Sequence, residues 1–348
     1  MKHIWTVSFI LLGIVTALYI GFGAERESEG YAIEDELDGL NEKVVLHFSH
    51  ITAENTPKGL AVTHFAQLVR EKTDGWVDIQ VFPNGILFTA QEEFVALKEQ
   101  EVHIIAPAFS EISLHDPKWL IMDMPYLFED EEMLRAVFDG EVGEALFASL
   151  SEQGYHGLSF WENGFKQFTN NVRPIRTPED LEGLSMRVMP SEALMKTFDH
   201  FGGIPKPFAF NEVYERLSEG AIDGTENSLT NIYSKKFYRQ QAYMTKSNHN
   251  YLGYAILMDQ TVWDKLPIEY QTAIEDAMAE TTMWLRDHVN ELNEGIYELL
   301  KESDQIEVYE LTPEEKQQWK EAVLPIYEYY ERQIGEDLFE KVRQLQSE

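Results

Sequence analysis

The sequence predicts an α/β protein with two domains. Residues 44–106 alternate predicted strands with predicted helices, which is typical of a largely parallel sheet. A second α/β pattern runs from about residue 166 to 249. The 348 residues, 44% of them hydrophobic, are sufficient for two well-buried cores.

In the first pattern, short runs rich in Val, Ile and Phe predict strands, and apolar residues three or four apart predict helices. The predicted strands are 44–50, 76–82 and 103–106, and the predicted helices are 60–72 and 92–100. The polar loop 54–58 follows the first strand. Ligands of parallel sheets bind beyond the carboxyl ends of strands, so we expect this loop near a site.

The stretch 160–191 carries the strongest indication of a site. Its apolar run ends in Asn163-Gly164, which is typical of a turn, and Lys166 follows at once. Arg187 lies inside an apolar strand predicted at 186–189. Because a lone charge in such a strand is costly unless it meets a counter-ion, we interpret Lys166 and Arg187 as the cationic ends of a small-anion site.

The remaining segments complete the α/β pattern. The predicted strands are 155–161 and 251–258, and the predicted helices are 131–153, 191–201, 212–219 (with Asn211 as N-cap), 270–303 and 313–346. The helix at 270–303 is long enough to cross between two domains.

Charge and composition exclude several classes of function. The net charge is -33, from 28 Lys and Arg against 61 Asp and Glu, so we expect no nucleic-acid partner. A buried anion site stays compatible with this excess, because distant charges are screened at physiological salt. The chain has no cysteine, which excludes disulfides, thiolate metal sites and a Cys nucleophile.

The N-terminus resembles a targeting segment. Residues 1–3 are basic, 4–22 are uncharged and apolar, and small residues occur at 21–24. Residues 1–24 therefore predict either a cleaved signal peptide or a retained membrane anchor, and the pattern leaves both open. Residues 25–43 are acidic and predict a solvated linker. Either way, we expect the rest of the chain outside the cytoplasm, in the periplasm or at the cell surface.

No catalytic or metal-binding constellation is evident. His47 and His50 are three apart on a strand and so face opposite sides. Metalloprotease, hydrolase and phosphate-loop motifs are absent. Glu226 beside Asn227 has no accompanying nucleophile. We therefore expect no enzymatic activity, no cofactor and no bound metal.

Seven ordered motifs resemble the extracytoplasmic solute receptors of TRAP transporters, of the DctP dicarboxylate-binding type. They are SHITAENTPKG (49–59), VFPNGIL (81–87), MPYLF (124–128), FWENGFKQFTN (160–170), IRTPEDLEGLSMRVMPS (175–191), AIDGTEN (221–227) and NIYSKKFY (231–238). The resemblance covers nearly all of 44–266. It implies a periplasmic-binding-protein-like clam shell with a long helix spanning the domains. The implied boundaries are 44–164 plus 253–292 for domain I and 165–252 plus 293–348 for domain II.

The resemblance also implies the residues of an interdomain site. Arg187 would pair with a substrate carboxylate and Asn227 would complete the shell. Lys166 stands where the family usually has Arg, which keeps the charge but loses the two-pronged geometry. Lys58 would meet a second carboxylate. The other residues expected in the cleft are Asn55, Thr56, Phe210 and Trp161, although from sequence alone the two aromatic residues are more typical of a core than of a cleft.

Two functions of different class follow from the resemblance. The first is a receptor that binds a small carboxylate, best a C4-dicarboxylate such as malate, succinate or fumarate, and delivers it to TRAP membrane subunits. The alternative is a membrane-anchored sensing subunit that signals the carboxylate to a kinase. An exported hydrolase is a remote third, because no nucleophile–base pair is evident.

Overall fold

A computed structural model describes residues 43–346 of this chain. The described residues from 44 onward belong to one compact unit. The signal peptide or anchor predicted at 1–24, and the linker predicted at 25–43 except for its last residue, lie outside the described residues. Within the described part, no helix has both the length and the apolarity to cross a membrane.

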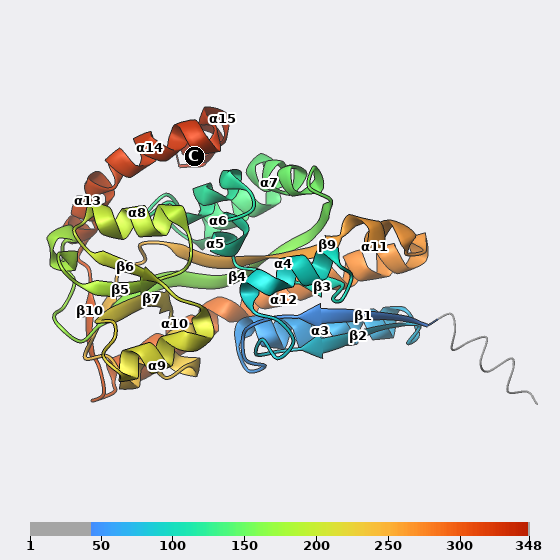
Figure 1. The fold of residues 1–348 in the computed structure, drawn as a ribbon, viewed down its shortest axis with the longest axis horizontal. Coiled ribbons are helices and arrows are strands. Elements are labelled where there is room, and N and C mark those ends of the chain that lie inside the picture. Colours follow the sequence, from blue (N-terminus) through green and yellow to red (C-terminus); the bar gives the residue numbers. More distant parts are fainter. Residues whose placement is uncertain (1–42, 347–348) are drawn as a thin grey trace, which may run out of the picture. The chain divides into compact units, whose positions relative to one another are not determined.

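The first part of the sheet has the strand order β2-β1-β3-β9-β4 (Figure 1). Strand β1 (Val44–Ser49) pairs in parallel with β2 (Val77–Phe82) and β3 (Ile104–Ile105). Strand β9 (Tyr251–Asp259) is antiparallel to both β3 and β4 (Tyr155–Asn170). The accompanying helices are α3 (Pro57–Lys72), α4 (Ala90–Lys98), α5 (Phe109–Ile112), η1 (Pro117–Asp123), α6 (Glu131–Asp139), α7 (Glu141–Ser151) and α11 (Gln260–Lys265).

The second part of the sheet uses the far half of β4. There β4 pairs with β7 (Gly224–Ser228) and β8 (Tyr243–Lys246), and β5 (Ser185–Val188) lies between β7 and β6 (Ile204–Pro207). Strand β10 (Glu307–Glu310) pairs with β8. The accompanying helices are η2 (Pro178–Leu181), α8 (Glu192–His200), η3 (Phe210–Glu212), α9 (Val213–Ser218), α10 (Leu229–Ser234), η4 (Phe237–Arg239), α13 (Pro313–Ala322), α14 (Leu324–Ile334) and α15 (Glu336–Leu345).

Two long elements belong to both parts. Strand β4 pairs with β9 as far as Phe165 and with β7 from Lys166 onward. Helix α12 (Ile268–Lys301) contacts α3 in the first part and α10 and β10 in the second (Figure 1). Its buried side chains recur at helical spacing, which explains why a single helix of 34 residues forms here. The predicted α/β fold with a helix spanning both parts is confirmed, and the residue boundaries of the two domains stay a prediction.

The predicted turn at Asn163-Gly164 is wrong. Both residues lie inside β4, where the register with β9 shifts between Glu162 and Gly164. Gly164 has a φ of 143°, and the Asn163 side chain donates to the Tyr254 hydroxyl at 2.7 Å. A β-bulge therefore absorbs the irregular residue pair, and the strand continues through it.

The helix predicted at 131–153 is two helices, because the chain is extended at Gly140 and α7 starts again from there. The predicted C-terminal helix is three helices, the last two separated by Gly335 with a φ of 117°. Helix α3 begins at Pro57 and so includes Lys58, which the sequence placed in a loop. Asn211 lies in η3 and is not the N-cap of α9.

Candidate functional site

A small cavity, partly open to solvent, lies between the two parts of the sheet. Its apolar lining includes Ile51 and Leu252 from the first part and Met189 and Phe210 from the second. Its polar lining comes from Thr52, Glu111, Arg187, Asn227, Asn231 and Tyr254. Because both parts contribute, the cavity has the position expected for a clam-shell ligand site.

Arg187 provides the cationic wall of this cavity. Its side chain is 1% exposed, and Nε and Nη2 both donate to the Phe208 carbonyl oxygen, at 3.1 and 2.9 Å. The third nitrogen, Nη1, is buried without a hydrogen-bond partner. Burial lowers the pKa of Arg187 to about 10, which leaves the guanidinium charged at neutral pH. One end of a buried cation is therefore available to an anion.

Asn227 and Asn231 lie at the end of β7 and one turn into α10. The Asn227 Oδ1 accepts hydrogen bonds from the Ser228 backbone N–H at 3.0 Å and from Asn231 Nδ2 at 2.9 Å. With its oxygen engaged twice, Asn227 is left to donate through its amide nitrogen. The Asn231 Oδ1 is buried without a partner, so this pair offers both an acceptor and a donor to a ligand.

Glu111 lines the opposite side of the cavity, in the first part of the fold, and Lys58 lies close to it. Burial raises the pKa of the Glu111 carboxyl group against the effect of Lys58. Lys58 is 1% exposed and its amine donates to the Ala106 carbonyl oxygen at 2.9 Å, 3.9 Å from the centre of the Tyr254 ring. Burial lowers the pKa of Lys58 to about 8. Lys58 thus lies behind the cavity wall and does not line it.

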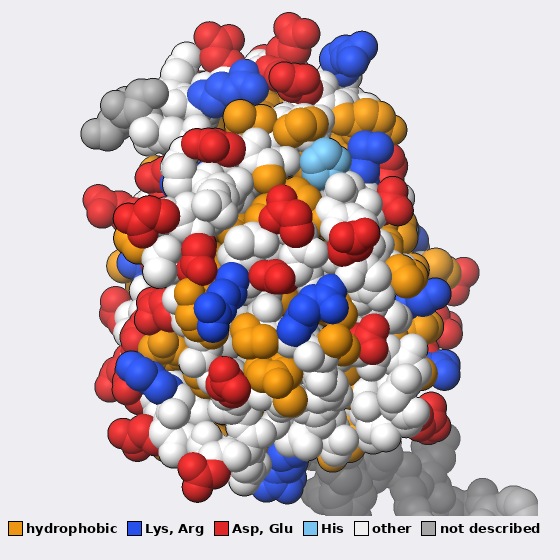
Figure 2. Space-filling model, turned by 90° about the vertical axis from the view of Figure 1, so that its left-hand side faces the viewer, with side chains coloured by type: hydrophobic (Ala, Val, Ile, Leu, Met, Phe, Trp, Pro, Cys, Tyr) orange, Lys and Arg blue, Asp and Glu red, His pale blue; other side chains and the backbone are white. Residues whose placement is uncertain are grey.

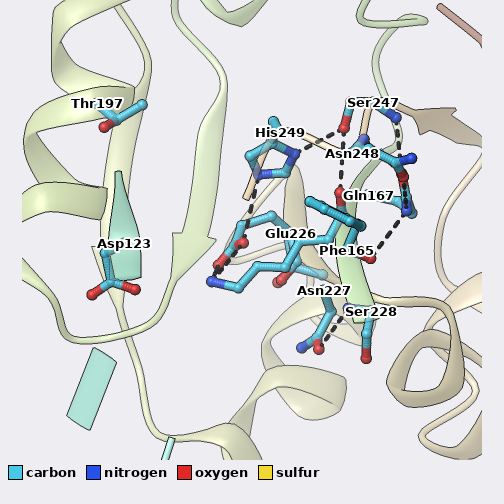
Figure 3. A network of polar contacts seen from close by, with 12 residues as sticks. Asp123, Phe165, Gln167, Thr197, Glu226, Asn227, Ser228, Ser247, Asn248 and His249 are labelled. Atoms are coloured by element: carbon cyan, nitrogen blue, oxygen red, sulfur yellow. Dashed lines mark hydrogen bonds and ion pairs between the residues drawn. The ribbon is translucent and has the colours of Figure 1, made fainter. Parts of the chain in front are cut away.

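Lys166 belongs to a buried ion cluster (Figure 3). Its amine is 3.0 Å from Glu226 Oε2, and both side chains are at most 1% exposed. His249 Nε2 is 3.6 Å from the same oxygen, and the imidazole stacks on Phe168 at 3.8 Å. Burial opposes ionisation of Glu226, yet Lys166 and His249 together hold the pKa of its carboxyl below the usual value. In this structure Lys166 neutralises Glu226 and does not line the cavity.

Of the predicted site residues, the structure brings Arg187, Asn227 and Phe210 together around the cavity. The other predicted residues do not line the cavity. Asn55 is exposed before α3, and Thr56 is the N-cap of that helix, accepting from the Gly59 N–H at 3.2 Å.

Trp161 lies in the hydrophobic core. It is 0% exposed, stacks on Phe48 and donates through Nε1 to Thr282. Ligand contact by Lys166, Lys58, Asn55, Thr56 or Trp161 stays a prediction, and none of the five lines the cavity.

Four polar residues of the cavity were not predicted from the sequence: Thr52, Glu111, Asn231 and Tyr254. Asn231 lies four residues after Asn227 in a segment dense in side-chain amides, so helical spacing would have indicated it. Glu111 follows the carboxyl end of β3, where parallel sheets bind ligands. Tyr254 sits in an apolar strand with no distinguishing signal.

Comparison with known proteins agrees with this architecture. The sequence profile of DctP, bacterial extracellular solute-binding protein family 7, matches residues 48–333. The C4-dicarboxylate-binding protein DctB of Bacillus subtilis is 39% identical, over 98% of each chain. The C4-dicarboxylate-binding periplasmic protein DctP of Rhodobacter capsulatus is 37% identical, over 89% of this chain and 93% of that protein.

A solved structure shows the same fold. It is a TRAP periplasmic solute-binding protein from Sulfurospirillum deleyianum with bound succinate, which is 37% identical and superimposes with a TM-score of 0.84. The match covers 87% of this chain and 99% of that one. The two-domain clam-shell α/β architecture is thereby confirmed. The chain belongs to family 7 of the bacterial extracellular solute-binding proteins, the DctP family of solute receptors.

Proposed function

We propose that this protein captures a C4-dicarboxylate outside the cytoplasm and delivers it to the membrane subunits of a TRAP-type transporter. The observation that carries the proposal is Arg187 Nη1, a buried cationic donor without a partner that belongs to a cavity-lining residue. A carboxylate is the small anion whose geometry fits a guanidinium edge.

The matched relatives support the substrate class. The Bacillus and Rhodobacter proteins are named for C4-dicarboxylate binding, and the Sulfurospirillum structure holds succinate. These names describe binding, so the alternative of a sensor subunit gains no support from them. The proposal assigns the protein a receptor role without a catalytic step.

Closure of the clam shell supplies the affinity. A carboxylate at Arg187 gains charge-assisted hydrogen bonds, with Asn227 and Asn231 as further partners. Exclusion of water lowers the local dielectric and strengthens these contacts. Reopening at the membrane subunits then releases the solute.

The location and the membrane partner belong to the same proposal. An extracellular receptor requires export, for which residues 1–24 serve as signal peptide or anchor. Mass spectrometry of the mature N-terminus in the native host distinguishes the two, because cleavage removes this segment.

The test of the site is calorimetric titration of the purified chain with succinate, malate, fumarate and a sugar acid such as galactonate. Wild type should bind the C4-dicarboxylates. Arg187→Ala should lose roughly 30- to 4,000-fold in affinity, since truncating a buried hydrogen-bonded charge partner costs about 2–5 kcal/mol. Arg332→Ala, which removes an exposed arginine of α14, is the matched control and should bind as wild type does.

Each contrary outcome removes a different part of the proposal. Wild-type affinity in a folded Arg187→Ala variant refutes the role of Arg187. Binding of sugar acids alone refutes the C4-dicarboxylate class and leaves Arg187 in place. A ligand at 100 times its dissociation constant should raise the free energy of unfolding by about 2.7 kcal/mol. The resulting rise in melting temperature provides an independent check.

A further inference from the structure

An acidic side chain lines the cavity that is proposed to bind an anion. Glu111, on the short helix α5, is 5% exposed and shares the cavity wall with Arg187. Its Oε2 accepts the Ala108 backbone N–H at 2.9 Å, which fixes the orientation of the carboxyl group. The anion-binding function leaves this residue without an explanation, because an ionised glutamate in the cavity would repel the ligand.

Charged and titratable groups face Glu111 from five elements. Lys58 on α3 and Arg187 on β5 favour its ionised form. Asp123 at the end of η1 disfavours the ionised form. The Glu111 carboxylate in turn raises the pKa of Glu93 on α4 and of the Tyr254 hydroxyl group on β9. The largest single effect is burial, and the net result is a raised pKa for the Glu111 carboxyl group.

The two ends of a C4-dicarboxylate have to be accommodated in this one cavity. Arg187 belongs to the second part of the sheet and binds one carboxylate under the proposed function. The second carboxylate then points toward the first part, whose acidic lining residue is Glu111. Two ionised carboxylates cannot share a dry site, whereas a neutral carboxylic acid donates a strong hydrogen bond to a carboxylate.

We propose that Glu111 acts as a neutral carboxylic acid whose O–H donates a hydrogen bond to the second carboxylate of the ligand, and so determines the preference for dicarboxylates. This inference rests on the proposed function, because it requires a ligand with two carboxylates. The donor for the distal end of the ligand then comes from the first part of the fold. Glu111 lines the cavity, whereas Lys58 does not.

The proposal has a direct consequence for pH dependence. The binding-competent form of Glu111 is protonated, so ionisation of Glu111 in the free protein competes with binding. Affinity should therefore fall as pH rises, with a limiting slope of about tenfold per pH unit once Glu111 is ionised in the free protein. A glutamine cannot ionise and supplies an N–H donor in place of the O–H donor of the neutral acid, so Glu111→Gln should lack this dependence.

The experiment is titration of succinate into the full chain by calorimetry from pH 6.5 to 9, for wild type and Glu111→Gln. The measured quantity is the ratio of the dissociation constant of wild type to that of the variant. The ratio should be smallest at the acid end of this range and rise as Glu111 ionises in the free wild-type protein. Lys58 has a pKa of about 8, which the Glu111 carboxylate helps to raise, so its titration also differs between the two proteins. That difference would appear equally with a ligand that has one carboxylate, which the succinamate control below detects.

Two controls locate the effect at the distal carboxylate. Glu93→Gln removes the neighbouring buried acid, which does not line the cavity, and should keep the pH dependence of wild type. Succinamate replaces one carboxylate of succinate by an amide, whose N–H groups suit an ionised Glu111. For succinamate, the ratio of the dissociation constant of wild type to that of Glu111→Gln should not rise with pH.

The outcomes separate the inference from the function on which it rests. A ratio that stays constant with pH, a Glu111→Gln variant that binds weakly at every pH, or an equal rise with succinamate overturns the inference while succinate binding stands. Loss of the pH dependence in Glu93→Gln overturns it as well, because the proton then belongs to Glu93. Absence of succinate binding by wild type at every pH overturns both the proposed substrate and the inference.

Discussion

Replacing Lys166 by methionine tests the buried ion cluster. Lys166 and Glu226 are at most 1% exposed, with 3.0 Å between the amine and Oε2. The variant keeps the aliphatic volume but leaves Glu226 with the His249 imidazole, 3.6 Å away, whose pKa is lowered by burial. Breaking a buried pair on one side typically costs about 3–5 kcal/mol, because an uncompensated charge stays in the core. We expect Lys166→Met to lose that free energy of unfolding at pH 7.

The loss should depend on pH in a defined direction. In wild type the folded-state pKa of Glu226 lies below the ordinary value of 4.5. Its contribution to stability is therefore present above pH 4.5 and disappears as the pH falls through the lowered pKa. Without Lys166, burial raises the pKa of Glu226, and the protonated acid is then tolerated in the core. The difference in stability between the two proteins should therefore shrink in acid.

Urea unfolding followed by circular dichroism measures this difference. Lys166→Met combined with Glu226→Gln should be more stable than Lys166→Met alone, since the second change removes the orphaned charge. Lys320→Met, which breaks the exposed pair with Glu129, is the matched control and should cost about 0–1 kcal/mol. Figure 2 shows Asp and Glu side chains interspersed with Lys and Arg over one face of the molecule. A Lys166→Met variant no less stable than the control, or a deficit that grows in acid, refutes the reasoning.

Two further predictions concern the scaffold. A Cβ at Gly224 on β7 would lie 2.1 Å from the Thr169 carbonyl oxygen, whereas Gly295 in α12 has nothing within 4 Å of that position. Gly224→Ala should therefore lower the urea midpoint sharply. Gly295→Ala should raise the free energy of unfolding by about 0.5–1 kcal/mol, because alanine favours a helix over glycine. A similar result for both variants would contradict the packing described. Trp161→Phe should lose the hydrogen bond to Thr282 and about 1 kcal/mol or more of stability without changing succinate affinity, so a selective loss of affinity would restore Trp161 to the site.

Much of the scaffold follows from local patterns. The order of strands and helices is readable because period-two and period-3.6 patterns are local properties of the chain. Arg187 was also identifiable, since a single charge in an apolar strand is anomalous wherever the strand lies. The errors occurred where a local turn signal was overruled, as at Asn163-Gly164. There a bulge and hydrogen bonds to distant residues keep β4 continuous.

The sequence by itself therefore determined the α/β class, the order of the elements and one cationic residue of the site. Tertiary structure decided which charges meet. Lys166 reads as a ligand contact in the sequence, but the register of β4 with β7 sets Phe168 opposite Glu226 and brings the lysine within 3.0 Å of that acid. Glu111 and Tyr254 reach the cavity only because β3 and β9 pair across about 150 residues of chain. Such neighbours are set by strand register and domain packing, which no local pattern of residues encodes.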